Sequence, residues 1–289
     1  MLTNKIFLVT GGAGFIGSHL IDELIDSGNH IICIDDLSTG KEENLKKNDN
    51  IDFIRKNLND VNLYKLDNNI SGIFHLAAQT SVPISINDFY MSSKNNLIGM
   101  LKILDFARKN SIPFVYASSS AIYGNQHLGN DEINDFNILS PYALDKLTME
   151  YYSKMCFDIY KNSSFGLRFF NVYGPRQDPS SPYSGVISIF IDKLLKKEAV
   201  TVNGGYQTRD FIYVKDVVSV ITKSMEHIIN NQICNFLNVG TGLSVTINDL
   251  LSLISNILDF NPKIINKSLP ISDPEKSEGT YGKLKNELK

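Results

Sequence analysis

The stretch KIFLVTGGAGFIGSHLIDELIDSG, residues 5–28, decides the fold of this chain. It opens on an apolar run with β-branched residues, which predicts a buried strand. A glycine turn follows, and the next residues place Leu20 and Leu24 on one face of a helix that Gly28 suits as its end. Residues 30–35, HIICID, predict a second buried strand. The chain therefore begins as strand, glycine turn, helix and strand.

The glycines Gly11, Gly14 and Gly17 have the spacing of a dinucleotide-binding turn. Such a turn lets the backbone approach a pyrophosphate at a helix N-terminus, where free N–H groups and the helix dipole favour an anion. A glycine turn without a ligand is the alternative, but the flanking strands and Asp35 at the end of the second strand favour a Rossmann fold. We expect Asp35 to bind an adenosine ribose. The second charge of Asp36 would repel a 2′-phosphate, so the sequence predicts NAD rather than NADP.

The alternation of strand and helix continues along the chain. Residues 51–58 and 72–78 predict the third and fourth strands, and residues 94–110 predict a helix with Leu97, Leu101 and Leu104 along one face. Residues 112–120, IPFVYASSS, predict the next strand. Its serines fall at the carboxyl end of a parallel strand, which is where open sheets of this class bind ligands.

A Tyr-Lys pair lies on the helix predicted for residues 140–155. Ser140 suits the N-cap and Pro141 the first helical position. Tyr142 and Lys146 are four residues apart and share one face of that helix. A half-buried aromatic beside a solvated lysine is the alternative. After a dinucleotide-binding fold and a serine cluster, we interpret the pair as acid–base machinery, in which the ammonium lowers the pKa of the phenol.

With these residues in place, the chain resembles a known family. The matching stretches are TGGAGFIGSHL, HLAAQTSV, SSSAIYG, YALDK, LRFFNVYGPRQ, TRDFIYVKDV and NVGTG. Together they resemble the extended short-chain dehydrogenases/reductases, and within them the NAD-dependent sugar-nucleotide epimerases and dehydratases. The resemblance is greatest to UDP-hexose 4-epimerases.

The resemblance implies which residues carry out the reaction. Ser119 would contact the reacting sugar oxygen, Tyr142 would be the base and Lys146 its partner, with NAD as cofactor. Dehydratases of the family carry an Asp-Glu pair directly after the catalytic hydroxyl, where this chain has Ser120 and Ala121. The implied reaction is therefore epimerisation at carbon 4 of a UDP-hexose through a transient 4-keto intermediate, not dehydration.

The resemblance also assigns contacts residue by residue. The implied cofactor-binding residues are Gly11, Gly14, Phe15, Ile16, Gly17, Asp35, Asp36, Asn57, Leu58, Ala77, Ala78, Gln79, Asn95, Tyr142, Lys146 and Phe170. The implied substrate-binding residues are Ser119, Ser120, Asn171, Val186, Arg209 and Ser277. Plain structural roles remain as alternatives, for example Phe170 as core and Arg209–Asp210 as an ion pair.

The chain departs from the family pattern at three places. Asn57 replaces the usual adenine-contacting Asp, and Pro270 stands where the family has a second pyrophosphate-binding arginine, in an Arg-x-Gly-Asp stretch. The third departure is that the sequence stops at KLKNELK, short of the final Trp/Pro-containing segment usual in the family, as a naturally short or a truncated chain would. Aligning Asp273 and Lys283 with their family counterparts places Ser277 beside the 2-position of the hexose, where a tyrosine would exclude an N-acetyl group. We therefore expect both plain and N-acetylated hexoses to be accepted.

The organisation expected is an α/β chain with two parts. Residues 1–170 would form the NAD-binding, doubly wound parallel Rossmann sheet, and residues 171–289 mainly a smaller C-terminal substrate domain, with some segments returning to the first. The family resemblance implies a homodimer through the helices around residues 97–104 and after Tyr142. The second of these helices carries Met149, Tyr152 and Met155 as excess apolar surface.

Composition narrows the function classes. The net charge of −3 and the absence of Lys/Arg blocks argue against a nucleic-acid partner. No apolar run is long enough for a membrane span. The three cysteines are far apart and the histidines have no metal spacing, so we expect no metal and a reducing, cytoplasmic setting. A decarboxylase or reductase of the same family, and a catalytically silent NAD-binding regulator, stay open as alternatives.

Overall fold

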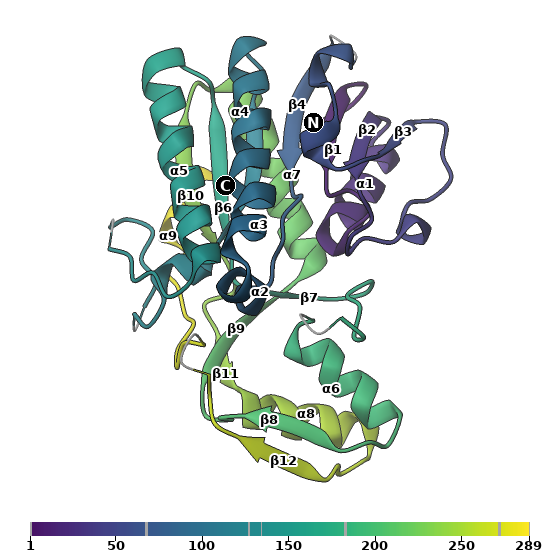
Figure 1. Cartoon of the computed structure of the whole chain (residues 1–289), viewed down its shortest axis with the longest axis vertical. Coiled ribbons are helices and arrows are strands. Elements are labelled where there is room, and N and C mark those ends of the chain that lie inside the picture. Colours follow the sequence, from purple (N-terminus) through teal and green to yellow (C-terminus); the bar gives the residue numbers. More distant parts are fainter. Residues whose placement is uncertain are drawn as a thin grey trace.

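A seven-stranded parallel sheet forms the centre of the computed structural model, which describes residues 2–66, 69–126, 128–133, 135–181, 184–270 and 273–288. The strand order is β10-β6-β5-β4-β1-β2-β3 (Figure 1). The strands are β1 (Ile6–Thr10), β2 (His30–Asp35), β3 (Ile51–Arg55), β4 (Ile70–His75), β5 (Phe114–Ser119), β6 (Ser164–Phe169) and β10 (Cys234–Val239). The doubly wound parallel sheet predicted from the sequence is confirmed.

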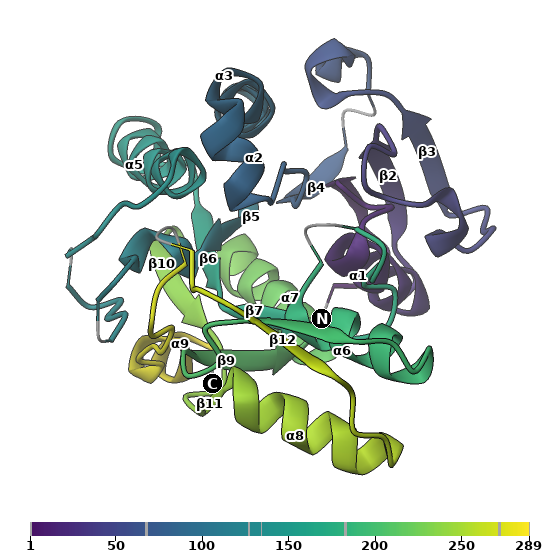
Figure 2. The ribbon, with the colours of Figure 1, turned by 60° about the horizontal axis from the view of Figure 1, so that its bottom comes forward.

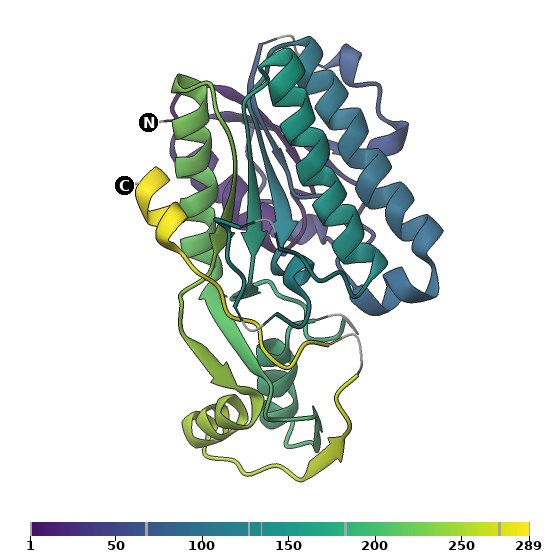
Figure 3. The ribbon, with the colours of Figure 1, turned by 90° about the vertical axis from the view of Figure 1, so that its left-hand side faces the viewer.

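Helices cover both faces of this sheet (Figure 3). The helices α1 (Phe15–Asp26) and α7 (Val214–Asn230) pack on one face, and α4 (Gly99–Lys109) and α5 (Pro141–Tyr160) on the other. Side chains alternate between these layers because a strand has a period of two residues. In β1, Phe7 and Val9 join the core under α1 and α7, whereas Leu8 joins the core under α4 and α5. Burial on both faces explains the uninterrupted apolar runs of the sequence.

Three short helical segments precede α4. They are α2 (Val82–Asn87), α3 (Phe89–Ser93) and a π-helical turn, Lys94–Ile98. The core under α4 contains Met100, Ile103 and Leu104, whereas Leu97 and Leu101 are only partly buried. Leu97 still packs against this core, so the predicted apolar face is confirmed at Leu97 and Leu104 and wrong at Leu101. The apolar face of this helix is wide, and spacing along the chain does not determine which edge of it meets the sheet.

A smaller unit lies beyond the carboxyl ends of the sheet strands (Figures 1 and 2). It contains α6 (Val186–Leu195), α8 (Ile247–Leu258) and the parallel strands β8 (Val200–Asn203) and β12 (Ile264–Lys267). These elements share a core of their own, which includes Phe190 and Leu251. The sheet β11-β9-β7 lies between the two units and is formed by β7 (Asn171–Tyr173), β9 (Thr208–Tyr213) and β11 (Ser244–Thr246).

The chain crosses between the two units more than once after residue 171. Strand β10 pairs in parallel with β6, and α7 packs against α1, so residues 214–239 belong to the large sheet and its helices. The last helix, α9 (Gly282–Glu287), lies beside β10, and its Leu284 packs on the core under α1 and α7. The second half of the chain therefore supplies elements to both units.

Candidate active site

The glycine turn after β1 has a geometry that only glycine allows. Gly11 has a φ of +73°, and a Cβ atom there would lie 2.6 Å from the backbone nitrogen of Ala77. A Cβ atom on Gly17 would lie 2.1 Å from the Gly11 carbonyl oxygen. Gly14 is the N-cap of α1 and has no side chain to cap it, so the N–H groups of the first turn, which contains Phe15 and Ile16, have no capping side chain. This cradle fits the pyrophosphate of a dinucleotide.

Two acids lie at the end of β2, beside the glycine turn. Asp35 accepts hydrogen bonds from the backbone N–H groups of Ala13 (2.9 Å) and Leu37 (2.8 Å), and burial raises the pKa of its carboxyl group. Asp36 accepts a hydrogen bond from the Asn57 side-chain amide, at 2.9 Å. Asn57, which is predicted to contact adenine, is thus bonded to Asp36 at the carboxyl end of β2, where the adenosine is expected to bind.

The loop after β4 is held by a buried asparagine. The backbone N–H of Ala77 donates to the Thr10 hydroxyl at 3.3 Å. Gln79 is bonded twice by Asn96: its N–H donates to Asn96 Oδ1 (2.8 Å), and Asn96 Nδ2 donates to the Gln79 carbonyl (3.0 Å). Asn96 is fully buried, whereas Asn95, the residue predicted from the sequence, is only partly buried.

Asn96 was not among the residues predicted from the sequence, and the cofactor contact expected of Asn95 stays a prediction. Of the two adjacent asparagines, Asn96 is four residues from both Ser92 and Met100, and all three are buried. Extending the helical period from the buried face would have found it.

The three predicted catalytic side chains meet at the carboxyl end of β5. Ser119 is the last residue of β5, and its Oγ caps the 3-10 turn Ser120–Tyr123 by accepting the Ala121 N–H at 3.1 Å. Lys146 Nζ lies 5.7 Å from the centre of the Tyr142 ring and donates to the Ala117 carbonyl of β5 at 2.7 Å. The exposed fractions of Ser119, Tyr142 and Lys146 are 9%, 9% and 2%.

The start of α5 is fixed from two directions, which orients Tyr142. The Ser140 hydroxyl caps the helix by accepting the Ala143 N–H at 3.2 Å. The backbone N–H of Tyr142 donates to the Ser85 hydroxyl of α2, also at 3.2 Å. Both bonds satisfy first-turn N–H groups that have no partner within the helix itself.

Burial dominates the ionisation of this group. Burial raises the pKa of Tyr142, and a hydrogen bond with Ser119 lowers it by less. Burial also lowers the pKa of Lys146 to about 8. The direction is therefore opposite to the lowered phenol pKa expected from the sequence, because the cost of desolvating the phenolate is larger than the stabilisation by Ser119.

The serines beside Ser119 have different surroundings. Ser118 Oγ donates to Glu150 Oε1 of α5 at 2.5 Å. Glu150 in turn receives two hydrogen bonds from Arg168 of β6, at 2.6 and 2.9 Å. Ser118 is therefore part of a buried network below the site, whereas Ser120 starts the 3-10 turn and stays partly exposed.

Three of the predicted substrate-binding residues converge on Asp210 of β9. Asn171 Nδ2 donates to the Asp210 carbonyl at 3.0 Å, and the Asp210 N–H donates to the Ser277 carbonyl at 3.1 Å. Arg209 precedes Asp210 and forms an ion pair with Asp273. The partner of Arg209 is therefore Asp273 and not its neighbour in the sequence.

Asp210 itself was missed as a site-forming residue. Its buried carboxylate accepts the N–H groups of Thr241 and Gly242 and the Tyr281 hydroxyl. The Tyr281 ring packs edge-on against Phe170, with 5.7 Å between the ring centres. Val186, the first residue of α6, is partly buried and packs against the core of the small unit.

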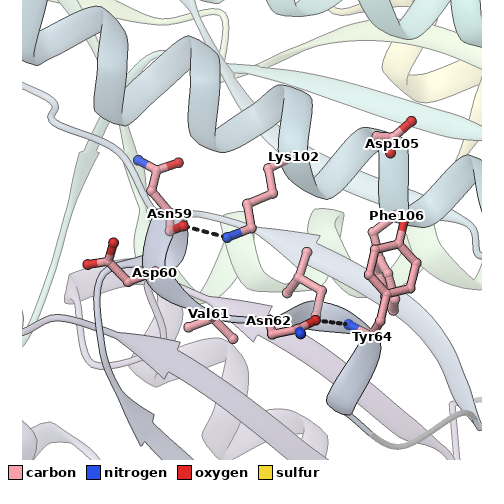
Figure 4. A pocket seen from close by; sticks show the side chains of 9 residues that line it. Asn59, Asp60, Val61, Asn62, Tyr64, Lys102, Asp105 and Phe106 are labelled. Atoms are coloured by element: carbon pink, nitrogen blue, oxygen red, sulfur yellow. Dashed lines mark hydrogen bonds between the residues drawn. The ribbon is translucent and has the colours of Figure 1, made fainter.

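A separate cavity of about 410 Å³ lies between residues 59–64 and α4 (Figure 4). None of the predicted site residues lines it. Lys102 extends along it and donates to the carbonyls of Leu58 and Asn59, so it fastens α4 to the segment that follows Asn57. Among the described residues no cluster of His, Cys, Asp and Glu could hold a metal ion, and no helix is long and apolar enough to cross a bilayer.

Known proteins are similar to this chain in sequence and in fold. The model of the NAD dependent epimerase/dehydratase family matches residues 7–240. A putative UDP-glucose 4-epimerase of Methanocaldococcus jannaschii is 39% identical over 266 residues, which cover 90% of this chain and 85% of that protein. UDP-glucuronic acid decarboxylase 1 of Arabidopsis thaliana is 31% identical over 97% of this chain and 65% of its own length.

A solved structure of UDP-N-acetylglucosamine 4-epimerase from Methanobrevibacter ruminantium M1, in complex with UDP-N-acetylmuramic acid, is similar throughout. It is 37% identical, superimposes with a TM-score of 0.93, and the match covers 99% of this chain and 92% of that one. The fold and the glycine turn agree with the family match. The chain belongs to the NAD-dependent epimerase/dehydratase family.

Proposed function

We propose that the protein epimerises carbon 4 of a UDP-hexose through a transient 4-keto intermediate, with NAD bound at the glycine turn. The observation that carries this proposal is the burial of Ser119, Tyr142 and Lys146 together at the carboxyl end of β5. A silent NAD-binding regulator would need none of these three side chains in contact.

The residues that would hold NAD lie along the carboxyl ends of the first strands. The glycine turn and the first turn of α1 suit the pyrophosphate, and Asp35 and Asp36 suit a ribose without a 2′-phosphate. The loop at Gln79, which Asn96 holds in place, would border the bound NAD on the side opposite the glycine turn. Bound NAD would supply the hydride acceptor and donor for carbon 4.

The chain's own residues account for the proton. The Tyr142 oxygen takes the proton of the sugar 4-hydroxyl as carbon 4 is oxidised, and returns it when carbon 4 is reduced from the other face. Ser119, hydrogen-bonded to Tyr142, holds the sugar oxygen at this position. Lys146 provides the positive charge that favours the phenolate. Ser120 and Ala121 offer no acid–base pair, so elimination of water does not compete.

The substrate range proposed is UDP-glucose and UDP-galactose together with UDP-GlcNAc and UDP-GalNAc. The small side chain of Ser277 leaves room for an N-acetyl group, and its backbone is joined to Asp210 beside Arg209. A relative and a solved structure named as epimerases of UDP-glucose and UDP-N-acetylglucosamine support this range. We also propose that the protein works as a homodimer.

The test is NMR of purified protein incubated with UDP-glucose, UDP-GlcNAc and UDP-glucuronate. We expect galactose and N-acetylgalactosamine anomeric signals without added cofactor. Mass spectrometry of the denatured supernatant should detect NAD, and NADP in its place would contradict the roles of Asp35 and Asp36.

A decarboxylase is the second candidate, because the chain also resembles UDP-glucuronic acid decarboxylase 1 of Arabidopsis thaliana. Release of carbon dioxide from UDP-glucuronate, with no change in the hexoses, would favour it over the epimerase.

A further inference from the structure

Asp145 is a buried carboxylate beside the catalytic group that the proposed chemistry does not use. It lies on α5 directly before Lys146, and its exposed fraction is 4%. Aspartate is seldom fully buried without a cationic partner in direct contact. No described cation lies within ion-pair distance of this one, and its Oδ2 atom has no hydrogen-bond partner among the described residues. The position therefore needs a physical explanation.

The contacts of Asp145 join α5 to the loop after β4, which contains Gln79 and is predicted to line the cofactor. Its Oδ1 accepts a hydrogen bond from the Ser93 hydroxyl at the end of α3, at 2.8 Å. Asn96, on the next π-helical turn, is close enough to lower the pKa of the Asp145 carboxyl, although burial raises that pKa by more. Asn96 is the residue that bonds Gln79 twice. A continuous chain of contacts thus runs from Gln79 through Asn96 to α5.

The charge of Asp145 acts on both members of the Tyr-Lys pair. Burial lowers the pKa of Lys146 to about 8, and the carboxylate of Asp145 opposes that fall. Burial raises the pKa of Tyr142, and Asp145 raises it further. One negative charge in a dry environment therefore favours the protonated form of each group.

On β4, β5, α3 and the π-helical turn, the other titratable groups near Tyr142 and Lys146 are neutral or exposed to solvent. His75 of β4 is fully buried, and burial, together with Lys146, lowers its pKa to about 3, so it is neutral. Tyr116 of β5 is neutral because burial raises its pKa well above the ordinary value. On the side of α3 and the π-helical turn, Asp88 and Lys94 are exposed to solvent.

We propose that Asp145 is a positioning residue that sets the protonation state of the Tyr142–Lys146 pair. Through Ser93 and Asn96 it also ties that pair to the loop after β4. It does not touch the reacting atoms. The inference rests on the proposed epimerase function for its kinetic readout, but the ionisation of Tyr142 can be followed without any substrate.

The test is the substitution Asp145→Asn, which keeps the size of the side chain and removes its charge. Without the carboxylate the pKa of Tyr142 and that of Lys146 should both fall. Phenolate with ammonium is the active pair, so both limbs of the bell-shaped pH profile of kcat should move to lower pH. A purely structural role would lower kcat by the same factor at every pH.

Two control variants separate the charge from the contacts. Asp158→Asn removes an exposed carboxylate from the same helix, one that pairs with Lys154, and should leave the profile in place. Ser93→Ala removes the hydrogen bond and keeps the charge of Asp145, so it should not move the limbs to lower pH.

A second readout does not depend on turnover. The 13Cζ resonance of Tyr142, assigned by its loss in Tyr142→Phe, reports the ionisation of the phenol directly. In Asp145→Asn it should titrate at lower pH than in the wild type. If no UDP-sugar is turned over, the proposed function fails, but this resonance still tests Asp145. An unmoved resonance, or a kcat loss of ~10²–10⁴-fold at every pH as expected for a catalytic acid or base, would overturn the proposal.

Discussion

Tyr142 combines two properties that oppose each other. A base must lose its proton, yet burial raises the pKa of this phenol. The side chains that favour the phenolate are the Ser119 hydroxyl and, on the proposed mechanism, the Lys146 ammonium. The oxidised nicotinamide ring would add a further positive charge at the site. The tyrosine is therefore suited to act when a cofactor is bound.

The substitution Tyr142→Phe should abolish epimerisation and leave cofactor binding in place. The phenolic oxygen is lost, while the glycine turn and the contacts of Gln79 are unchanged. Loss of a general base of this kind costs ~10²–10⁴-fold in kcat. Turnover is measured by NMR and bound NAD by mass spectrometry of the same preparation. Wild-type turnover in this variant would remove Tyr142 from the proposed mechanism.

Ser277 is proposed to determine which sugars enter. The substitution Ser277→Tyr should sharply reduce turnover of UDP-GlcNAc and UDP-GalNAc and spare the plain hexoses, because a phenol ring would occupy the space of the N-acetyl group. Comparison of kcat/KM on the two pairs measures the effect. Lys276→Tyr, which adds the same ring at an exposed neighbouring position, is the control. Equal loss on both pairs in Ser277→Tyr would contradict this role.

At the scale of elements, one buried ion pair joins α5 to β6, and its hydrogen bonds extend to β5 and β10. Arg168 of β6 and Glu150 of α5 have side chains that are 1% and 2% exposed. Glu150 also accepts from Ser118, and Arg168 donates to the Tyr123 hydroxyl at 2.7 Å. Tyr123 then donates to Asn238 of β10. The network thus connects β5, α5, β6 and β10 directly below Ser119.

Arg168→Met should destabilise the fold strongly, because it leaves the Glu150 carboxylate buried and unpaired. Breaking such a pair costs about 3–5 kcal/mol in the free energy of unfolding. Lys154→Met removes the cation of an exposed pair on the same helix and should cost about 0–1 kcal/mol. Urea unfolding of the two variants measures both. Similar losses would mean that the buried pair is not a main tie between these elements.

Helix α5 also presents apolar side chains to solvent. The exposed positions on α5 are Leu144, Tyr151, Tyr152, Met155, Ile159 and Tyr160. Those on α3 and the π-helical turn beside it are Phe89, Tyr90, Met91 and Ile98. Met149 is not among them: it is fully buried in the core under α4 and α5, so its predicted place on the surface was wrong. Exposed apolar side chains gathered on neighbouring helices in this way are typical of an interaction surface.

At the scale of the whole molecule, we expect a homodimer formed by this face of α3, the π-helical turn and α5. A two-fold axis would pair the same apolar patch of two copies and remove it from water. Light scattering at micromolar concentration should give twice the chain mass of 32.4 kDa. The double substitution Tyr151→Glu with Ile159→Glu should shift the mass toward the monomer, since it places charges in the apolar patch. A monomeric wild-type protein at that concentration would contradict the expectation.

The sequence alone determined the parts of the protein that depend on neighbours along the chain. Apolar runs bounded by glycines predicted the strands, and glycine spacing predicted the turn before α1, because strand period and backbone reach depend only on local geometry. The four-residue spacing placed Tyr142 and Lys146 on one helical face for the same reason. Together with the motifs, these features were sufficient for the fold and the family.

Only the tertiary structure decided which side chains meet across elements. It placed Asn96 beside Gln79, paired Arg209 with Asp273, and buried Asp145 next to Lys146. It also reversed the expected direction of the Tyr142 pKa. Each outcome depends on how closely distant segments pack and how much water they exclude. Desolvation and cross-element contact arise from that packing and have no counterpart in the local spacing of residues.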